Sequence, residues 1–194
     1  MIKKYKLFFG LTIGVIIMFN LLGCFVGEKY QKYSSIDPAI NIVTDYPLAW
    51  KFSETKGSYN SYSQVVFFPV GKENSGRTVM AITVRDSSKI EISPLTLAAF
   101  AEDILAKRKQ YKDFIVLSKK KISLLGREAI SMELSYKSLE NLLKRDAKVV
   151  PFLEKIVVFK KGNAYYTLRY EDPSENFPKF SRAFEHLVKS LRFK

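Results

Sequence analysis

The chain has 194 residues, 47% of them hydrophobic, and a formal net charge of +13 at pH 7. This length fits one ordinary domain behind a short N-terminal segment. The sequence contains one cysteine and one histidine, which excludes an internal disulfide and metal sites built from several histidines.

The N-terminal segment has the order of parts found in a secretory signal. Three lysines lie among the first six residues, residues 7–22 are apolar apart from Thr12 and Asn20, and a Leu-Leu-Gly-Cys sequence ends the run at residue 24. An apolar run of about 16 residues is shorter than the roughly 20 that a transmembrane helix needs, and no basic cluster follows it as a stop signal. We therefore predict a signal peptide over residues 1–23, with a permanent membrane span as the alternative.

The residues at the end of this run resemble the lipobox of bacterial lipoproteins, where a transferase attaches diacylglycerol to the cysteine and a peptidase cuts before it. The resemblance implies cleavage between Gly23 and Cys24 and a lipid anchor on the Cys24 thiol, with palmitate among its acyl chains. Elsewhere a lone cysteine is usually an inert core residue, but here it falls at the end of the apolar run. Two or more acyl chains anchor a protein stably. We expect the mature lipoprotein on the extracytoplasmic side of a cell membrane.

The basic surplus indicates a class of partner. Removal of residues 1–23 leaves 29 basic and 19 acidic residues, a net charge of +10. Such a surplus is typical of proteins that bind nucleic acid or anionic membranes. Because export excludes nucleic acid, we expect attraction to anionic lipid or to an acidic partner, worth up to about 1 kcal/mol per basic residue near a charged bilayer.

A stretch without apolar periodicity follows the cysteine. We predict that residues 24–37 form the lipidated cysteine and a tether that reaches at most about 45 Å when fully extended. Residues 38–194 contain no second linker and no internal repeat, so we expect them to form a single domain.

Apolar patterns predict the strands of this domain. Residues 65–68 and 79–84 are apolar runs with a glycine-bounded loop between them, typical of a hairpin in a sheet covered on both faces. Apolar and polar residues alternate over 130–136, which predicts a half-buried strand. A Gly-Asn pair beginning at Gly162 divides residues 156–170 into two strands, which indicates a second hairpin.

Two amphipathic helices are also predicted. Ser93 and Pro94 supply an N-cap and a first helical residue, and the positions that follow share one apolar stripe: Leu97, Phe100, Ala101, Ile104 and Leu105. The last segment carries a second stripe, formed by Phe177, Phe180, Phe184, Leu187, Val188 and Leu191. Strands, helix, strands and helix in this order predict an α+β domain in which helices flank an antiparallel sheet.

Three basic segments or insertions have a structural and a functional interpretation. Residues 107–109 close the first helix, and we expect them to be solvated and to oppose the helix dipole, with a lipid or partner contact as the alternative. Residues 119–121 follow a strand over 114–117 and are expected to keep an exposed strand edge or end from aggregating. Residues 138–149 are expected to form a short amphipathic helix between strands, with a partner or membrane contact as the alternative to ordinary packing.

The sequence contains few groups suited to catalysis. His186 lies opposite the phenylalanine stripe of its helix, so we expect it to face water and to have no catalytic role. With Cys24 lipidated there is no Cys/His pair, and neither a Gly-x-Ser-x-Gly elbow nor a phosphate-binding glycine loop occurs. A Ser/His/Asp triad is disfavoured by the outward position of the histidine.

Two carboxylate pairs have structural interpretations. Glu102 and Asp103 are expected at the surface, with Asp103 pairing with Lys107 one turn on. The other pair, Glu171 and Asp172, leads into residues 172–176, which link the last strand to the last helix. We expect the oxygens of this link to cap that helix, with a hard cation such as calcium as the alternative ligand.

The series of elements resembles the PsbP-like family, whose fold is shared with the Mog1 protein: an antiparallel sheet sandwiched by helices. The segments that carry the resemblance are 46–52, the helix entered at 93–94, 125–129, 161–166 and 184–193. The resemblance implies an α/β/α sandwich, a role in supporting a membrane complex such as photosystem II, and calcium as a cofactor. The one histidine matches no metal-binding histidine of the family, which argues against a photosynthetic role.

Together these observations predict a membrane-anchored lipoprotein with a non-catalytic binding domain that contacts or stabilises a membrane protein complex. We expect no catalytic residues, no metal ligands, and no cofactor apart from the calcium that the resemblance implies. The alternative is an extracytoplasmic carrier of a small ligand or metal ion in a pocket between sheet and helix. A hydrolase would require a cluster of polar side chains in a cleft, which the sequence does not indicate.

Overall fold

The computed structural model describes residues 29–56, 62–71, 78–87, 96–141 and 145–194. Within these ranges it has ten strands and two helices. In chain order they are β1 (Tyr30–Ser34), β2 (Ile42–Pro47), β3 (Trp50–Thr55), β4 (Tyr62–Pro69), β5 (Val79–Asp86), α2 (Leu97–Arg108), β6 (Lys112–Leu124), β7 (Arg127–Leu139), β8 (Val149–Lys161), β9 (Ala164–Pro173), α3 (Phe177–Ser190) and β10 (Arg192–Phe193).

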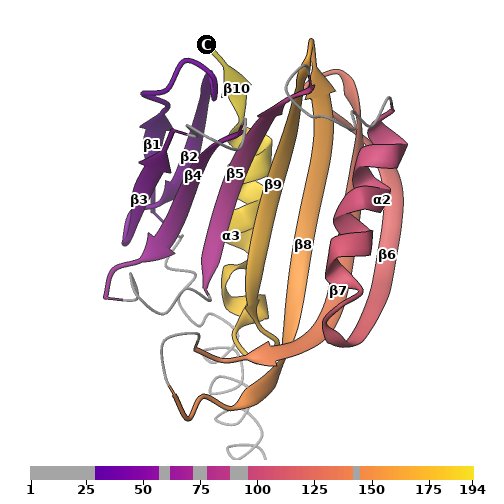
Figure 1. Cartoon of the computed structure of the whole chain (residues 1–194). Helices are drawn as coiled ribbons and strands as arrows, with labels where there is room; N and C mark the ends of the chain where they lie inside the picture. The colour runs from indigo at the N-terminus through magenta and orange to yellow at the C-terminus, as the bar shows by residue number, and fades with distance from the viewer. Residues whose placement is uncertain (1–28, 57–61, 72–77, 88–95, 142–144) are drawn as a thin grey trace, which may run out of the picture.

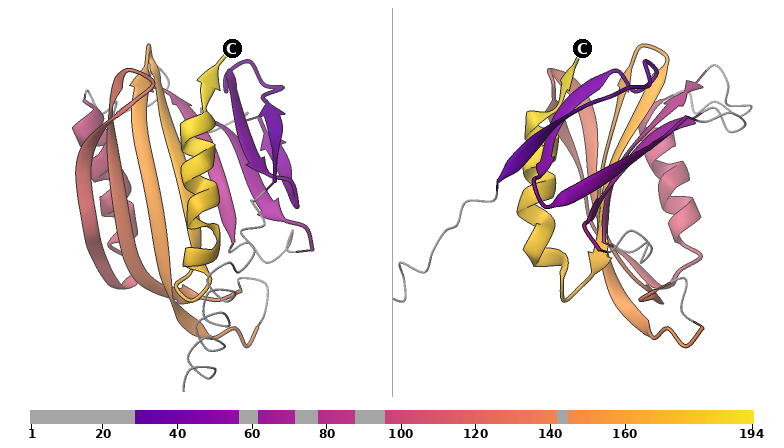
Figure 2. Two further views of the ribbon diagram at one scale, coloured as in Figure 1. Left: turned by 180° about the vertical axis from the view of Figure 1, so that it is seen from behind. Right: turned by 90° about the vertical axis from the view of Figure 1, so that its left-hand side faces the viewer.

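The strands form two antiparallel sheets. Seven of them make a large sheet in the order β3-β4-β5-β9-β8-β7-β6, and β1-β2-β10 make a small one (Figure 1). Helix α2 lies on one face of the large sheet, while α3 and the small sheet lie on the other (Figure 2). The predicted α+β sandwich is thereby confirmed, and the small second sheet is an addition that the sequence patterns did not indicate.

Both predicted hairpins are present. Strands β4 and β5 pair with Val65 opposite Ile82, and β8 pairs with β9 up to Lys161 opposite Ala164. Gly162 in the second turn has a φ of 56°, which a residue without a Cβ adopts at little cost. The alternation predicted for 130–136 is also confirmed, because its apolar members are at most 3% exposed.

The large sheet separates two cores. On one face, α3 and the small sheet pack against β3, β4, β5 and β9 around large side chains such as Phe67, Tyr170 and Phe184. On the other face, α2 packs over β7 and β8 through Phe100, Ala101 and Leu105. A sheet buried on both sides explains the near-continuous apolar runs in the sequence.

The prediction of a tether up to residue 37 is wrong for the part that the structure describes. Tyr30–Ser34 forms β1, which pairs with β2 from Tyr30 opposite Pro47 to Ser34 opposite Val43. Tyr33 is 1% exposed, and its ring lies edge-on to Phe67 with ring centroids 5.3 Å apart. The folded domain therefore includes residues 30–34. The segment is too short to show periodicity, and the burial of Tyr33 and the pairing with β2 fix it in place.

The first helix begins later than predicted. Its N-cap is Thr96, whose Oγ1 accepts a hydrogen bond from the Ala99 amide at 3.1 Å, while Ser93 and Pro94 lie outside the described residues. Its apolar stripe is confirmed by the burial of Phe100, Ala101 and Leu105.

Two predictions on the β6–β8 region are corrected. The helix expected over 138–149 is wrong at both described ends, since β7 continues to Leu139 and β8 begins at Val149; residues 142–144 lie outside the described ranges. Residues 119–121 do lie on an edge strand of the large sheet, as expected, but within β6 rather than after it. The ladder between β7 and β8 extends to Ser138 and Leu139 on one strand and to Val149 on the other. Its backbone hydrogen bonds do not depend on the side-chain pattern from which the helix was predicted.

Candidate functional site

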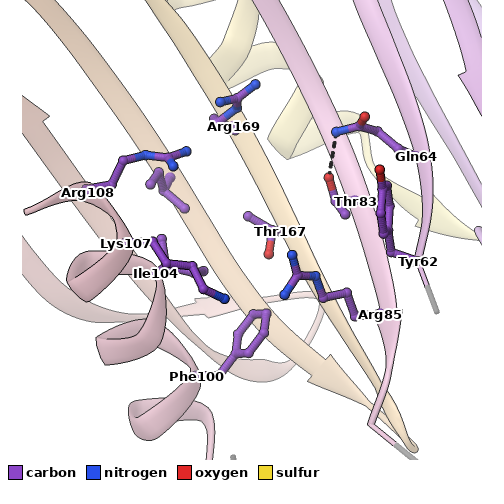
Figure 3. Close-up of a pocket in the computed structure, with 11 residues that line it drawn as sticks. Tyr62, Gln64, Thr83, Arg85, Phe100, Ile104, Lys107, Arg108, Thr167 and Arg169 are labelled. Carbon is purple, nitrogen blue, oxygen red and sulfur yellow. Dashed lines mark hydrogen bonds between the residues drawn. The ribbon is translucent and has the colours of Figure 1, made fainter. Parts of the chain in front are cut away.

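A cavity of about 290 Å³ lies between α2 and the large sheet (Figure 3). Helix α2 packs over β7 and β8, so side chains of β4, β5 and β9 on the same face are left to form the floor and far wall. Apolar side chains line part of it, together with four hydroxyl or amide groups and four cations; the lining residues are Tyr62, Gln64, Thr83, Arg85, Phe100, Ile104, Lys107, Arg108, Ile156, Thr167 and Arg169. We call this the arginine cavity.

Strand alternation places polar groups in the cavity. On β5, Ile82 and Val84 are buried in the core that faces α3, so Thr83 and Arg85 project to the side of α2. Thr83 lies directly opposite Thr167 of β9. On its other side Thr83 is paired with Gln64 of β4, whose Nε2 donates a hydrogen bond to Thr83 Oγ1 at 2.9 Å.

Two arginines flank this threonine pair. Arg85 follows Thr83 by two residues on β5, and Arg169 follows Thr167 by two residues on β9. Because the strands are antiparallel, the two arginines lie at opposite ends of the cavity, about 14 Å apart along the strands from the rise per residue. Figure 3 shows the Arg169 side chain near the Arg108 end and the Arg85 side chain directed into the space between β5 and α2.

A buried carboxylate holds the Arg108 end together. Glu154 has no solvent exposure, and its two oxygens each accept a 2.9 Å hydrogen bond from Arg108, one from Nε and one from Nη2. Burial acts to lower the pKa of Arg108, but the hydrogen bonds and charge of Glu154 outweigh it and hold that pKa above its ordinary value. This is the bidentate geometry in which arginine and carboxylate bind most strongly.

Arg169 completes a four-residue network. Its Nη1 lies 3.0 Å from Glu171 Oε2 and 3.8 Å from Glu154 Oε1. Two buried carboxylates and two guanidinium groups thus neutralise one another beneath the cavity. The prediction that residues 107–109 form a solvated helix end is wrong for Arg108, whose side chain is 20% exposed; Lys107 does pair with Asp103 at 2.6 Å, as predicted.

The capping expected from the link over residues 172–176 is wrong for Asp172. Strand β9 continues through Pro173, which places Asp172 inside the sheet with no solvent exposure. Its carboxylate accepts hydrogen bonds from Thr78 Oγ1 at 2.8 Å and from the Tyr170 hydroxyl at 3.1 Å. Burial and the Asp172 charge raise the pKa of Tyr170. The N-cap residue of α3 is Asn176, and it makes no side-chain capping bond.

His186 lies on α3, across the large sheet from the arginine cavity. Its ring stacks on Tyr30 with centroids 3.8 Å apart, and Nε2 is 3.3 Å from Asp45 Oδ2. The side chain is 40% exposed. The expected water-facing position is therefore correct only in part, because Tyr30 covers one face of the ring. Gly23 and Cys24 lie outside the described residues, and the cleavage and lipidation predicted there stay predictions.

A second hollow, of about 250 Å³, lies between α3 and strands β6 to β8. Two of its charged side chains pair with each other, since Lys155 Nζ lies 3.1 Å from Glu185 Oε1; Lys155 Nζ also lies 2.8 Å from Ser181 Oγ. Across the described ranges no group of three or more metal-binding side chains gathers. Neither helix within those ranges is long and apolar enough to cross a membrane.

Sequence patterns indicated Lys107 and Arg108 on the helix side of the arginine cavity, but the groups on its sheet side were not predicted. A usable signal was present, because the pattern Thr-x-Arg occurs on both β5 and β9, at residues 83–85 and 167–169. Polar residues at every second position of an otherwise apolar strand indicate a face that is not fully packed. To combine the two Thr-x-Arg patterns into one site, it is also necessary to know that β5 and β9 are neighbours.

Comparisons with known proteins establish the fold. No protein-family model matches the chain, and no curated protein matches its sequence. The structure is similar to that of cyanobacterial PsbP (CyanoP) from Synechocystis sp. PCC 6803, with 14% identity and a TM-score of 0.54, over 89% of this chain and 96% of that one.

Two further solved structures are similar. The Ran-binding protein Mog1p of Saccharomyces cerevisiae has 11% identity and a TM-score of 0.51, over 86% of this chain and 96% of its own. LpqN, involved in cell envelope biogenesis of Mycobacterium tuberculosis, has 13% identity and a TM-score of 0.50, over 87% and 92%. The domain thus has the Mog1/PsbP-like fold that the sequence resemblance implied, and a fold shared by proteins with such different descriptions does not assign a role.

Proposed function

We propose that this chain is a lipid-anchored protein of the extracytoplasmic membrane surface whose domain acts by binding rather than by catalysis. The observation that carries the proposal is the lining of the arginine cavity, where donors of hydrogen bonds and positive charge surround a space of about 290 Å³. Such a concave site, part apolar and part polar, is suited to holding a small ligand.

The chemistry of these groups favours binding. A guanidinium group stays protonated in proteins and cannot act as a general base. Glu154 and Glu171, the buried carboxylates that pair with the cavity arginines, are each held by an arginine, which leaves them poorly placed to accept a proton from a substrate. The only histidine of the sequence, His186, lies on the other face of the large sheet, in contact with Tyr30.

The anchor places this binding site close to a membrane. Since β1 begins at Tyr30, five residues, 25–29, separate Cys24 from it, so Cys24 lies at most about 20 Å along the chain from β1. This is less than half of the reach predicted from the sequence alone. Such a short connection supports a role at the membrane surface, where the net charge of +10 after signal removal favours anionic lipid.

Intact-mass analysis of the membrane fraction tests the anchor. We expect the wild-type mass to show loss of residues 1–23 and addition of a diacylglyceryl group, with or without a further acyl chain, on Cys24. The matched variant Cys24→Ser should keep residues 1–23 and carry no lipid. An unmodified full-length wild-type chain would contradict the anchor.

A second candidate function is contact with a membrane protein complex, and the outer edge of the large sheet favours it. Edge strand β6 exposes three consecutive apolar residues, Ile115, Val116 and Leu117, at 56%, 40% and 51%. Exposed edge strands can pair with a strand of another chain. A photocrosslinking residue at Val116 should capture a membrane protein, and the same residue at Lys32 on β1 should not; equal or absent capture would remove this candidate.

A further inference from the structure

Among the residues that the structure describes, Arg85 is the cation of the arginine cavity without an ion pair. Lys107 pairs with Asp103, Arg108 with Glu154, and Arg169 with Glu171. Among the described residues, the Arg85 side chain has neither a hydrogen bond nor an ion pair. Its side chain is half buried and points into the cavity (Figure 3).

Hydroxyl groups surround the Arg85 end. Tyr62 is the direct neighbour of Arg85 across β4 and β5, and its hydroxyl has no partner among the described residues. Thr83 Oγ1 already accepts a hydrogen bond from Gln64, so its own proton is free to be donated into the cavity. Thr167 presents a further hydroxyl from the opposed position on β9.

The charges around the cavity determine which sign of ligand charge it favours. The part of the cavity wall formed by described residues contains four cations and no carboxylate. The nearby Glu154 and Glu171 lie beneath the wall and are neutralised by Arg108 and Arg169. Apolar side chains of the lining, such as Phe100 and Ile104, lower the local polarity and so strengthen the electric field of the Arg85 charge. A site with this balance binds an anion and disfavours a metal ion.

We propose that the arginine cavity binds a small organic oxyanion, a carboxylate or phosphate with an apolar body, through a bidentate contact with Arg85 and hydrogen bonds from Tyr62 and Thr167. A guanidinium fork matches the geometry of both oxyanions. A volume of about 290 Å³ is at the low end for ligand sites, which restricts the ligand to a small one. The inference rests on the proposed binding function and does not depend on the anchor.

Binding of benzoate and phenyl phosphate to the full-length chain in non-ionic detergent tests the site, by calorimetry or ligand-observed NMR. We expect at least one probe to bind wild-type protein, while benzyl alcohol, the neutral molecule with the same ring, does not. The probe that binds more tightly identifies the carboxylate or phosphate as the preferred group. Affinity should fall as ionic strength rises, because the site is partly open to solvent.

Variants separate this contact from general charge. Arg85→Gln should weaken binding about tenfold to hundredfold, as expected for loss of a charge-assisted hydrogen bond, and Arg85→Lys should weaken it less. Arg127→Gln, which removes an exposed arginine at the start of β7, should leave affinity unchanged. Because Arg85 has no partner among the described residues, we expect Arg85→Gln to fold; Tyr62→Phe is a second variant, expected to weaken binding severalfold.

Three outcomes would overturn the proposal: absence of binding by both anions, equal binding of benzyl alcohol, or equal affinity in Arg85→Gln and wild type. A chain that is lipidated on Cys24 but binds neither anion would remove this site and leave the anchor intact. A chain that binds a probe but carries no lipid would do the reverse.

Discussion

Glu154 of β8 and Glu171 of β9 lie directly opposite each other on neighbouring strands, and both are buried. Like charges at opposed positions destabilise a sheet unless other groups compensate them. Arg108 reaches Glu154 from α2, and Arg169 reaches both carboxylates from β9. The ion pair between Arg108 and Glu154 therefore connects α2 to the large sheet at the edge of the arginine cavity.

Removal of Arg108 should destabilise the fold more than most substitutions. Arg108→Leu leaves the charge of Glu154 buried with only Arg169 at 3.8 Å, so we expect a loss of about 3–5 kcal/mol in the free energy of unfolding. Urea unfolding followed by the fluorescence of Trp50, the only tryptophan and 4% exposed, measures it. The double variant Arg108→Leu with Glu154→Leu should recover much of the loss; a double variant no more stable than the single one would contradict the pairing.

The corrected start of the domain predicts where truncation becomes harmful. A chain beginning at Lys29 keeps β1 and should fold with cooperative unfolding. A chain beginning at Pro38 lacks β1 and the buried Tyr33, and we expect it to lose several kcal/mol, comparable to the 3–5 kcal/mol of a large aromatic core deletion. Circular dichroism and urea unfolding compare the two chains. Equal stability would restore residues 30–37 to the role of a tether.

Asp37 gives the protein an acid-sensitive contact. Burial alone would raise the pKa of Asp37, but hydrogen bonds from Ser63 Oγ at 2.5 Å and the Ala39 amide at 2.9 Å, with the charge of Lys56, hold that pKa below its ordinary value. The stabilisation is therefore full above pH of about 4, the unfolded value, and is lost as the pH falls through the lower folded value.

Substitution of Asp37 should show this pH dependence directly. Asp37→Asn should lower the free energy of unfolding by about 1–3 kcal/mol at pH 7, and the difference from wild type should shrink as the pH is lowered from 5 to 2. Asp103→Asn, which removes a carboxylate whose side chain is 45% exposed, serves as the control. A difference between Asp37→Asn and wild type that does not change with pH would contradict the role of the carboxylate charge.

The N-cap of α2 can be tested by a matched pair of substitutions. Thr96→Ala removes the oxygen that accepts from the Ala99 amide and should lower the free energy of unfolding by about 1 kcal/mol. Thr96→Ser keeps an equivalent oxygen and should cost only a few tenths of that. Thermal unfolding of the two variants distinguishes them; if Ser93 were the cap instead, neither substitution would matter and Ser93→Ala would.

Much of the fold could be predicted from local patterns. The burial of alternate residues over 130–136, the turn at Gly162 and the apolar stripe on the helix from Phe177 follow from the periods of a strand and of a helix. Short or mixed segments were misassigned. Residues 30–34 have no clear period, and residues 138–149 contain leucines among charges that fit a helix as well as a strand.

The sequence by itself determined the elements with strong periodicity, the absence of an internal disulfide and the composition from which a signal and lipid anchor are predicted. The tertiary structure decided that Arg108 reaches Glu154, 46 residues away in the chain, and that β5 and β9 are neighbours. The physical reason is that side-chain periods report only which face of an element is buried. Which distant strand lies beside it, and hence which charges meet in the arginine cavity, depends on how the whole sheet is paired.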